Sequence, residues 1–93
     1  MEGGLAYLNM GRYQEAVPLI ERFVKAVPND RFAHLGLSIA YTELGRDQDA
    51  RAQVAEVLHI DPGFTLPPPD KWPWKNSRFA QLQYVDLRKA GLK

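Results

Sequence analysis

The order of apolar and polar positions between residues 31 and 62 predicts a pair of helices. The first helix should end at Gly45, because glycine tolerates the left-handed conformation that follows a helix end. A second helix is expected near Asp47 to Ile60, with Pro62 just beyond it, since proline cannot donate a hydrogen bond to the preceding turn. The apolar set on the wheel of the first helix is Leu35, Leu37, Ile39, Ala40, Tyr41 and Leu44.

The same pattern occurs once earlier in the chain, at a shift of 34 residues and without a gap. Gly11 should therefore end a first helix, and a second helix is expected near Tyr13 to Ala26. Pro18 lies early in that second helix, where its missing donor costs least. The identical pairs are Ala6 and Ala40, Tyr7 and Tyr41, Gly11 and Gly45, Arg12 and Arg46, Gln14 and Gln48, Ala16 and Ala50, and Pro28 and Pro62.

Small residues in each copy indicate where helices approach one another. Ala16 and Ala50 stand where the two helices of a pair should cross, and Gly3-Gly4 is best explained by a similarly close approach. Bulky apolar residues follow each alanine on the same face, and these are Ile20, Phe23, Val54 and Val57.

This spacing resembles the tetratricopeptide repeat, whose pattern places a large residue, Leu-Gly, Tyr, Ala, a bulky apolar residue and Pro within 34 residues. In residues 31–62 these positions hold His34, Leu37, Ser38, Tyr41, Ala50, Val54 and Pro62; in residues 1–30 they hold Gly3, Gly4, Tyr7, Ala16, Ile20 and Pro28. His34 replaces the usual tryptophan, which predicts looser packing there. The position of the first large residue falls before Met1, so the first repeat is truncated at its N-terminus. The resemblance implies an all-α fold, a short solenoid of antiparallel helix pairs over residues 1–62.

The tail breaks the period. Residues 63–76 contain Phe64, three consecutive prolines and two tryptophans; prolines in a row favour an extended conformation, and the aromatic residues predict that the segment packs on the repeats. Residues 77–93 should form a capping helix from Ser77 to Ala90, with Asn76 or Ser77 as its cap and Gly91 beyond its end. Two apolar edges are expected on this helix, one formed by Phe79, Leu82 and Val85 and the other by Ala80, Tyr84 and Leu87.

Three phrases of the tail are Phe64-Thr65-Leu66, Pro73-Trp74-Lys75-Asn76 and Leu87-Arg88-Lys89-Ala90-Gly91-Leu92. Together they resemble the C-terminal end of bacterial multidomain proteins that join a class III adenylate or guanylate cyclase domain to tetratricopeptide repeats. The resemblance implies an alternative role, as a regulatory or oligomerisation region of a nucleotide cyclase or related signalling protein. The catalytic domain itself is not in this chain.

Composition excludes several functional classes. Twelve basic and eleven acidic residues give a net charge of +1, without the basic excess typical of a nucleic-acid binder. No apolar run approaches the roughly 20 residues that span a bilayer, and no signal peptide is visible, so a cytoplasmic protein is expected. The resemblance of the tail implies that the protein is bacterial. There is no cysteine, and His34 and His59 lack the partners of a metal or catalytic site. We predict no catalytic, cofactor-binding or metal-binding residues, and therefore no enzyme.

The resemblance also implies where a partner would bind, because the first helix of each pair lines the inner, concave surface in this family. The predicted groove is mainly apolar and lacks the lysine and asparagine cluster that clamps a C-terminal carboxylate. It would accept a partner peptide or helix from another protein. Alternatively, the groove is filled by the chain's own Trp72-Pro73-Trp74, by a preceding repeat, or by a second copy in a homodimer. The predicted groove residues are Leu5, Leu8, Asn9, Phe32, Leu35, Ile39, Thr42 and Glu43.

Overall fold

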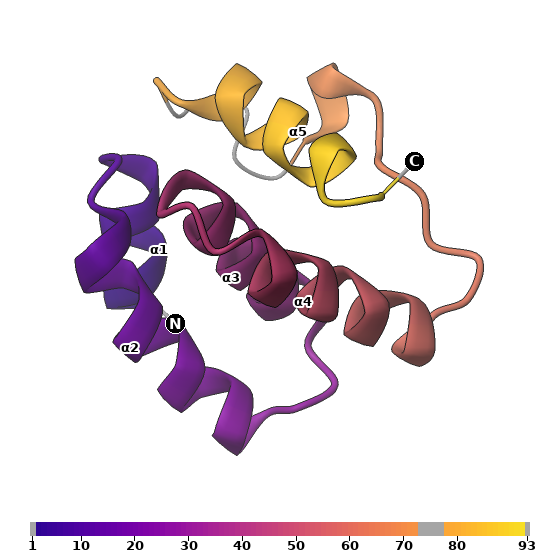
Figure 1. Ribbon diagram of the computed structural model, residues 1–93, viewed down its shortest axis with the longest axis horizontal. Helices are drawn as coiled ribbons and strands as arrows, with labels where there is room; N and C mark the ends of the chain where they lie inside the picture. Colours follow the sequence, from indigo (N-terminus) through magenta and orange to yellow (C-terminus); the bar gives the residue numbers. More distant parts are fainter. Residues whose placement is uncertain (1, 73–77, 93) are drawn as a thin grey trace.

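The computed structural model describes residues 2–72 and 78–92. Within these ranges the chain forms five α-helices and one short 3₁₀ helix, without a β-strand (Figure 1). The predicted all-α fold is confirmed, and the second helix of each predicted pair has the predicted bounds. The elements are α1 (Glu2–Asn9), α2 (Tyr13–Ala26), α3 (Arg31–Glu43), α4 (Asp47–Ile60), η1 (Pro69–Lys71) and α5 (Ala80–Lys89).

The two turns within the helix pairs have the same geometry, as the repeat predicts. Gly11 and Gly45 have φ values of 75° and 79°, in the left-handed region that favours glycine. The residue after each glycine donates its amide to the carbonyl five residues earlier, Arg12 to Tyr7 at 2.8 Å and Arg46 to Tyr41 at 2.7 Å. Each arginine also lies over the ring of the same tyrosine. The 34-residue period is therefore repeated in the turn hydrogen bonds as well as in the sequence.

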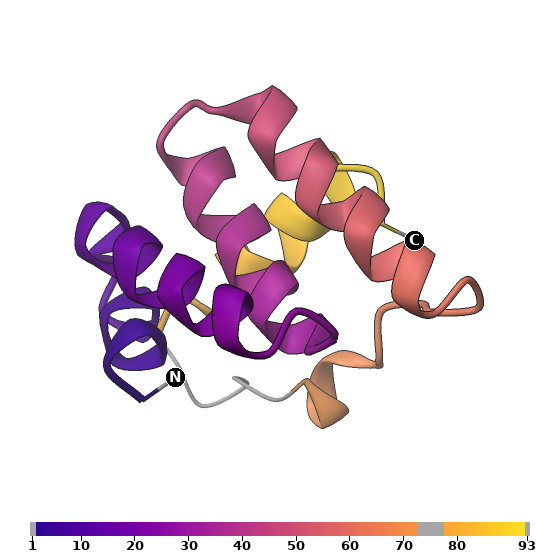
Figure 2. The ribbon, with the colours of Figure 1, turned by 90° about the horizontal axis from the view of Figure 1, so that it is seen from below.

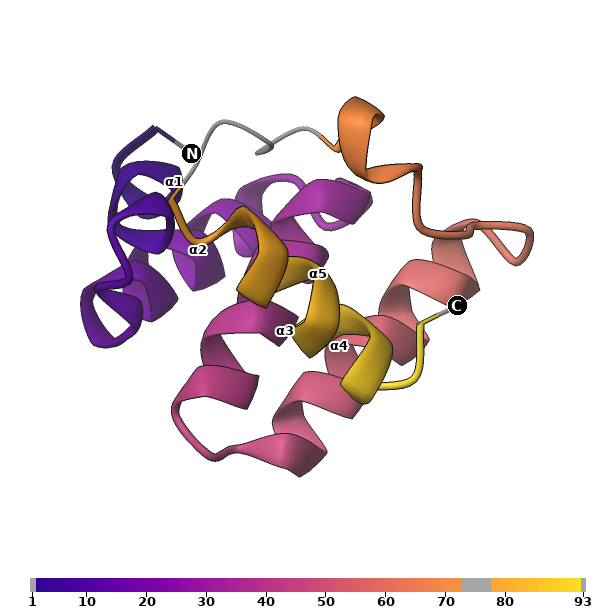
Figure 3. The same ribbon diagram turned by 90° about the horizontal axis from the view of Figure 1, so that it is seen from above.

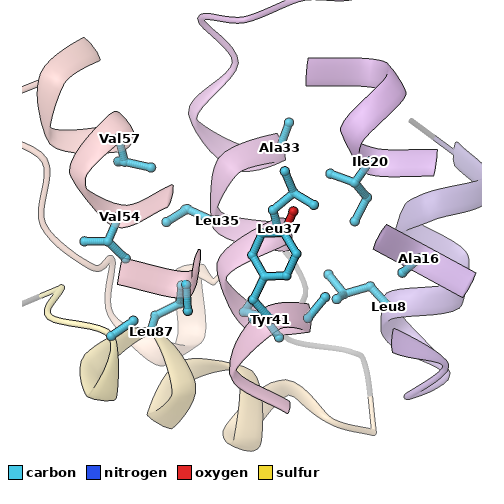
Figure 4. Packing of buried hydrophobic residues seen from close by; sticks show 14 of the residues in the cluster. Leu8, Ala16, Ile20, Ala33, Leu35, Leu37, Tyr41, Val54, Val57 and Leu87 are labelled. Atoms are coloured by element: carbon cyan, nitrogen blue, oxygen red, sulfur yellow. The ribbon is translucent and has the colours of Figure 1, made fainter. Parts of the chain in front are cut away.

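Helix α3 is the central element. Asp30 starts it, because its side chain accepts hydrogen bonds from the amides of Phe32 and Ala33 at 3.0 and 3.4 Å. The helix then contacts α1, α2, α4 and α5, so that every residue from 33 to 41 is buried (Figures 2 and 3). The hydrophobic core of the molecule is built around this helix (Figure 4).

Small residues allow the close helix approaches that the sequence predicted. A Cβ atom added at Gly4 would lie 2.7 Å from Cγ1 of Ile20, so only glycine fits where α1 meets α2. Ala16 and Ala50 are buried in the core. The Ser38 hydroxyl donates to the backbone carbonyl of Ala50 at 3.0 Å, which ties α3 to α4.

His34 occupies a buried packing position, as predicted from the repeat. Its Nε2 lies 2.7 Å from the carbonyl oxygen of Pro28, and its Nδ1 lies 2.7 Å from Oε1 of Gln53. The ring thus connects the α2–α3 loop to α4 by hydrogen bonds, where a tryptophan would contribute mainly apolar contacts.

The segment after α4 returns along the repeats to α5. Asp61 pairs with Arg31 at 2.7 Å, and the chain continues without helix through Pro68. Contrary to the extended conformation expected for the consecutive prolines, the last of them starts η1 at Pro69, because proline is tolerated at the first position of a helical turn. The Trp72 side chain is buried edge-on against the ring of Tyr84, with centroids 5.7 Å apart. Trp74 and the other residues of 73–77 lie outside the described residues.

The last helix is shorter than predicted. It begins at Ala80 rather than Ser77, and Phe79 precedes it without a capping side chain. The predicted caps, Asn76 and Ser77, lie outside the described residues. Helix α5 ends as expected, since Gly91 has a φ of 111° and Leu92 donates its amide to the Leu87 carbonyl at 3.0 Å.

Candidate partner-binding face

The predicted groove residues come together on α1 and α3, but few of them are at the surface. Leu8, Leu35 and Ile39 are fully buried members of the core cluster. The side chain of Leu5 lies outside the described part of the structure. The remaining groove residues are partly buried, and these are Asn9, Phe32, Thr42 and Glu43.

Helix α5 lies across this face. It packs against α3, and Figure 3 shows it running diagonally over the repeat helices. At its start, the Phe79 ring occupies the space beside the α1–α2 turn, where a Cβ atom on Gly11 would meet it at 2.7 Å. Further along, Gln83 donates to Oδ1 of Asn9 at 3.4 Å and Asp86 is hydrogen bonded to Glu43. The face predicted to bind a partner is thus covered by a helix of the same chain.

The predicted edge of Ala80, Tyr84 and Leu87 packs against the core, but the most buried stripe of α5 also contains two polar residues. Gln83, Asp86, Leu87 and Ala90 are buried, at the spacing of one helix face. Leu87 extends from α5 into the same cluster as Leu35 and Val54 (Figure 4).

The expectation of a buried Leu82–Val85 edge is wrong for both residues, which are 41% and 54% exposed. The rotation of α5 is fixed instead by Phe79 at the α1–α2 turn and by Tyr84, which packs on Trp72 and donates to the Pro67 carbonyl at 2.7 Å. With these two contacts made, Leu82 and Val85 point away from the repeats. Spacing alone could have suggested the 83-86-87-90 stripe, but its two polar residues argued against it.

A polar cluster lies beneath α5. Burial, the hydrogen bond with Glu43 and the charge of that group together raise the pKa of Asp86 from 3.8 to about 8, although Lys89 acts in the opposite direction. Burial, together with the charges of Glu43 and Asp86, raises the pKa of Tyr13 to about 12. Two further buried atoms here, Tyr13 Oη and Gln83 Oε1, have no hydrogen-bond partner among the described residues.

A hollow lies on the side of α3 away from α5, between α2 and α4. Its volume is about 470 Å³, and Leu37 and Val24 form part of its apolar lining. Tyr41 donates to Glu21 across it at 2.6 Å, and the Arg46 guanidinium lies 4.4 Å from the tyrosine ring centroid. Burial and the hydrogen bond to Glu21 hold the pKa of Tyr41 above its ordinary value. The hydrogen bond between Tyr41 and Glu21 thus connects α3 to α2 across the hollow.

The repeats form two helix pairs with matching turns, and α3, the first helix of the second pair, lies at the centre. This is the architecture that the 34-residue spacing predicted. A family model described as "Tetratricopeptide repeat" matches residues 1–63. The chain belongs to the tetratricopeptide repeat family. Tetratricopeptide repeats are scaffolds for protein interaction, and that general role applies to this chain.

No curated protein and no solved structure matches the chain. The tetratricopeptide match ends at residue 63, before η1 and α5. The resemblance of the tail to cyclase-linked proteins therefore stays a prediction. None of the helices in the described ranges is both long and apolar enough to cross a membrane.

Proposed function

We propose that the tetratricopeptide repeats bind a helix of a partner protein on the face formed by α1 and α3, and that α5 occupies this face until the partner replaces it. The observation that carries this proposal is α5 itself. It is a separate helix, outside the matched repeats, and it buries one stripe of side chains on the predicted groove. A surface that accepts one amphipathic helix has the shape needed for another.

Helix α5 is a poor occupant of this face. It buries Gln83 and Asp86 while Leu82 and Val85 remain in water. Each buried polar atom without a partner costs about 1–3 kcal/mol, and two such atoms, Tyr13 Oη and Gln83 Oε1, lie in this interface. A partner helix with better-matched side chains gains that energy when it displaces α5.

Because α5 is joined to the repeats by a linker in the same chain, it has a large advantage that a partner must overcome. A segment attached by a short linker competes at an effective concentration of the order of millimolar. Weak partners are therefore excluded, and only a helix with clearly better contacts replaces α5. The proposal thus predicts that loosening α5 increases binding by any helix that fits.

The test uses a synthetic peptide of residues 78–92 and the full chain labelled with ¹⁵N. The receptor is the Leu87→Ala chain, whose own α5 lacks its fully buried leucine. Peptide addition should shift the amide signals of Asn9, Thr42 and Glu43 in this variant much more than in wild type. The matched control is the Leu82→Ala chain, in which the lost leucine is exposed and the shifts should equal those of wild type.

A folded Leu87→Ala chain that shows no shift at these amides would refute the proposal. If circular dichroism shows that Leu87→Ala unfolds, Phe79→Ala loosens the other end of α5 and serves in its place. A second copy of the chain is the competing occupant, since it could exchange α5 between two molecules. Light scattering on the same samples detects such a dimer. If the chain is a dimer in the absence of peptide, the occupant of the face is a second copy of the chain and not a partner protein.

A further inference from the structure

The geometry points to the chemistry of the partner: we propose that its helix carries a lysine or arginine at the position where α5 carries Asp86. This inference rests on the proposed function, because it assumes that a helix replaces α5 on the same face. It concerns one position of that helix, the one that lies over Glu43.

At this position α5 places an acidic side chain against another acidic side chain, that of Glu43. Asp86 is only 4% exposed and its carboxyl group is hydrogen bonded to the carboxyl group of Glu43. Two carboxyl groups can form such a bond only if they share a proton, since two carboxylates repel each other. The raised pKa of Asp86 agrees with this arrangement, in which the two carboxyl groups hold one proton between them.

The surrounding groups leave the acidic character of the site uncompensated. Tyr13, at the start of α2, is the other titratable group from the repeats, and its charge would also be negative. Lys89, the nearby cation, belongs to α5 and leaves with it. Glu43 forms no ion pair with another described residue. Asn9 and Gln83 are neutral.

The far end of the face is mixed in charge and does not alter this assignment. Asp47 and Arg51 line a small hollow there together with Lys89 and Ala90, one turn beyond Asp86. Their opposite charges offset each other. The repeats therefore offer a carboxyl group and a phenol at the Asp86 position, and an entering ammonium or guanidinium group could bond to both Glu43 and the Tyr13 oxygen.

A cationic side chain on a partner helix would also bind Glu43 without the shared proton that the contact with Asp86 requires. Asp86 holds a proton in its contact with Glu43, so α5 binds less well as the pH rises toward 8. A lysine or arginine helix keeps its charge over that range and forms an ion pair without a shared proton. The advantage of the cationic helix over α5 should therefore grow from pH 6 to pH 8 and change little above pH 8.

The test compares three peptides of residues 78–92 for binding to the full-length Leu87→Ala chain: the native sequence, D86A and D86K. D86A removes the second carboxyl group without adding a cation. We expect D86K to bind at least about tenfold more tightly than native, and clearly more tightly than D86A, because charge-assisted bonds to a partly buried carboxylate exceed neutral ones. In a receptor that also carries Glu43→Gln, the difference between D86K and D86A should fall to about twofold or less.

The outcomes separate the two proposals. If no peptide binds a folded receptor, the binding face itself is refuted. If all three bind equally, or if D86K keeps its advantage over D86A in the Glu43→Gln receptor, the face stands and the cation preference is refuted.

A second measurement does not depend on a weakened receptor. In the full chain without other changes, D86K should have a higher melting temperature than D86A at pH 8, and Glu43→Gln should remove that difference. The melting temperatures of the single and double variants form a double-mutant cycle for the 43–86 contact. A D86K chain that melts no higher than D86A would overturn the inference as well.

Discussion

The polar groups buried inside the repeats differ from those buried beneath α5 in how completely they are hydrogen bonded. Within the repeats, His34 has a hydrogen-bond partner at each ring nitrogen, Ser38 donates to α4 and Tyr41 donates to Glu21. Beneath α5, Asp86 meets another carboxyl group, and Gln83 keeps one oxygen without a partner. Both regions belong to one continuous apolar cluster.

The difference separates a fixed scaffold from a replaceable helix. Buried polar groups with full partners hold the repeats in one arrangement, whereas buried groups without partners reduce the free energy that holds α5 in place. Local opening should therefore begin at α5.

The largest effect is expected at the centre of the repeats. Leu35→Ala leaves a cavity in α3, and such truncations cost about 2–5 kcal/mol of unfolding free energy. In a chain of this size that loss should unfold much of the population at 37 °C. Urea denaturation followed by circular dichroism measures it, and a loss below about 1 kcal/mol would show that α3 is not the central element.

Leu87→Ala should have a smaller global effect, although its leucine is equally buried. The loss is limited to the free energy that docks α5, because the repeats can stay folded without it. Trypsin should then cleave at Arg88 and Lys89 faster than in wild type, while the far-ultraviolet spectrum changes little and the tryptophan emission shifts to the red as Trp72 becomes exposed. Simultaneous loss of the repeats and of α5 would mean that the two regions unfold as one unit.

The third effect depends on pH. The pKa of Asp86 is raised on folding from 3.8 to about 8, so the folded chain binds more protons than the unfolded chain between these values. Its stability should therefore fall as pH rises from about 4 to 8 and level off above 8. Asp86→Asn should remove this contribution. The stability of the variant should therefore increase relative to that of wild type as the pH rises. Melting temperatures of both proteins between pH 5 and 9 test this; parallel curves would contradict the assignment.

A fourth, smaller effect concerns the contact that orients α5. Tyr84→Phe removes the hydrogen bond to the Pro67 carbonyl but keeps the ring packed on Trp72, so a loss of about 0.5–1.5 kcal/mol is expected. Denaturant titration at pH 6, where Asp86 keeps its proton, gives the value. No loss would remove Tyr84 from the contacts that set the rotation of α5.

The smallest effect is expected on the outer side of α5. Leu82→Gln should change the unfolding free energy by no more than about 0.5 kcal/mol, because the side chain is largely in water. Val85→Thr should behave likewise. A loss comparable to that of Leu87→Ala would mean that α5 turns a different face to the repeats in solution.

The sequence alone determined the repeat region in detail. The bounds of α2 and α4, the left-handed Gly11 and Gly45 and the close approach at Gly4 could all be predicted, because each depends on neighbours within a turn or on the 34-residue period. Hydrogen bonds of helices and turns act over a few residues, so a single sequence contains the information that fixes them.

Only the tertiary structure decided how the tail meets the repeats. The sequence predicted a last helix and an apolar face on α3, but it could not show that the helix covers that face or that Asp86 rests on Glu43. The rotation of α5 depends on the sum of contacts from the α1–α2 turn, from α3 and from the segment at Pro67 and Trp72, which lie far apart along the chain. The amphipathic pattern offered two apolar edges. Packing at both ends of the helix placed Ala80, Tyr84 and Leu87 on the core together with Gln83 and Asp86, and left Leu82 and Val85 exposed.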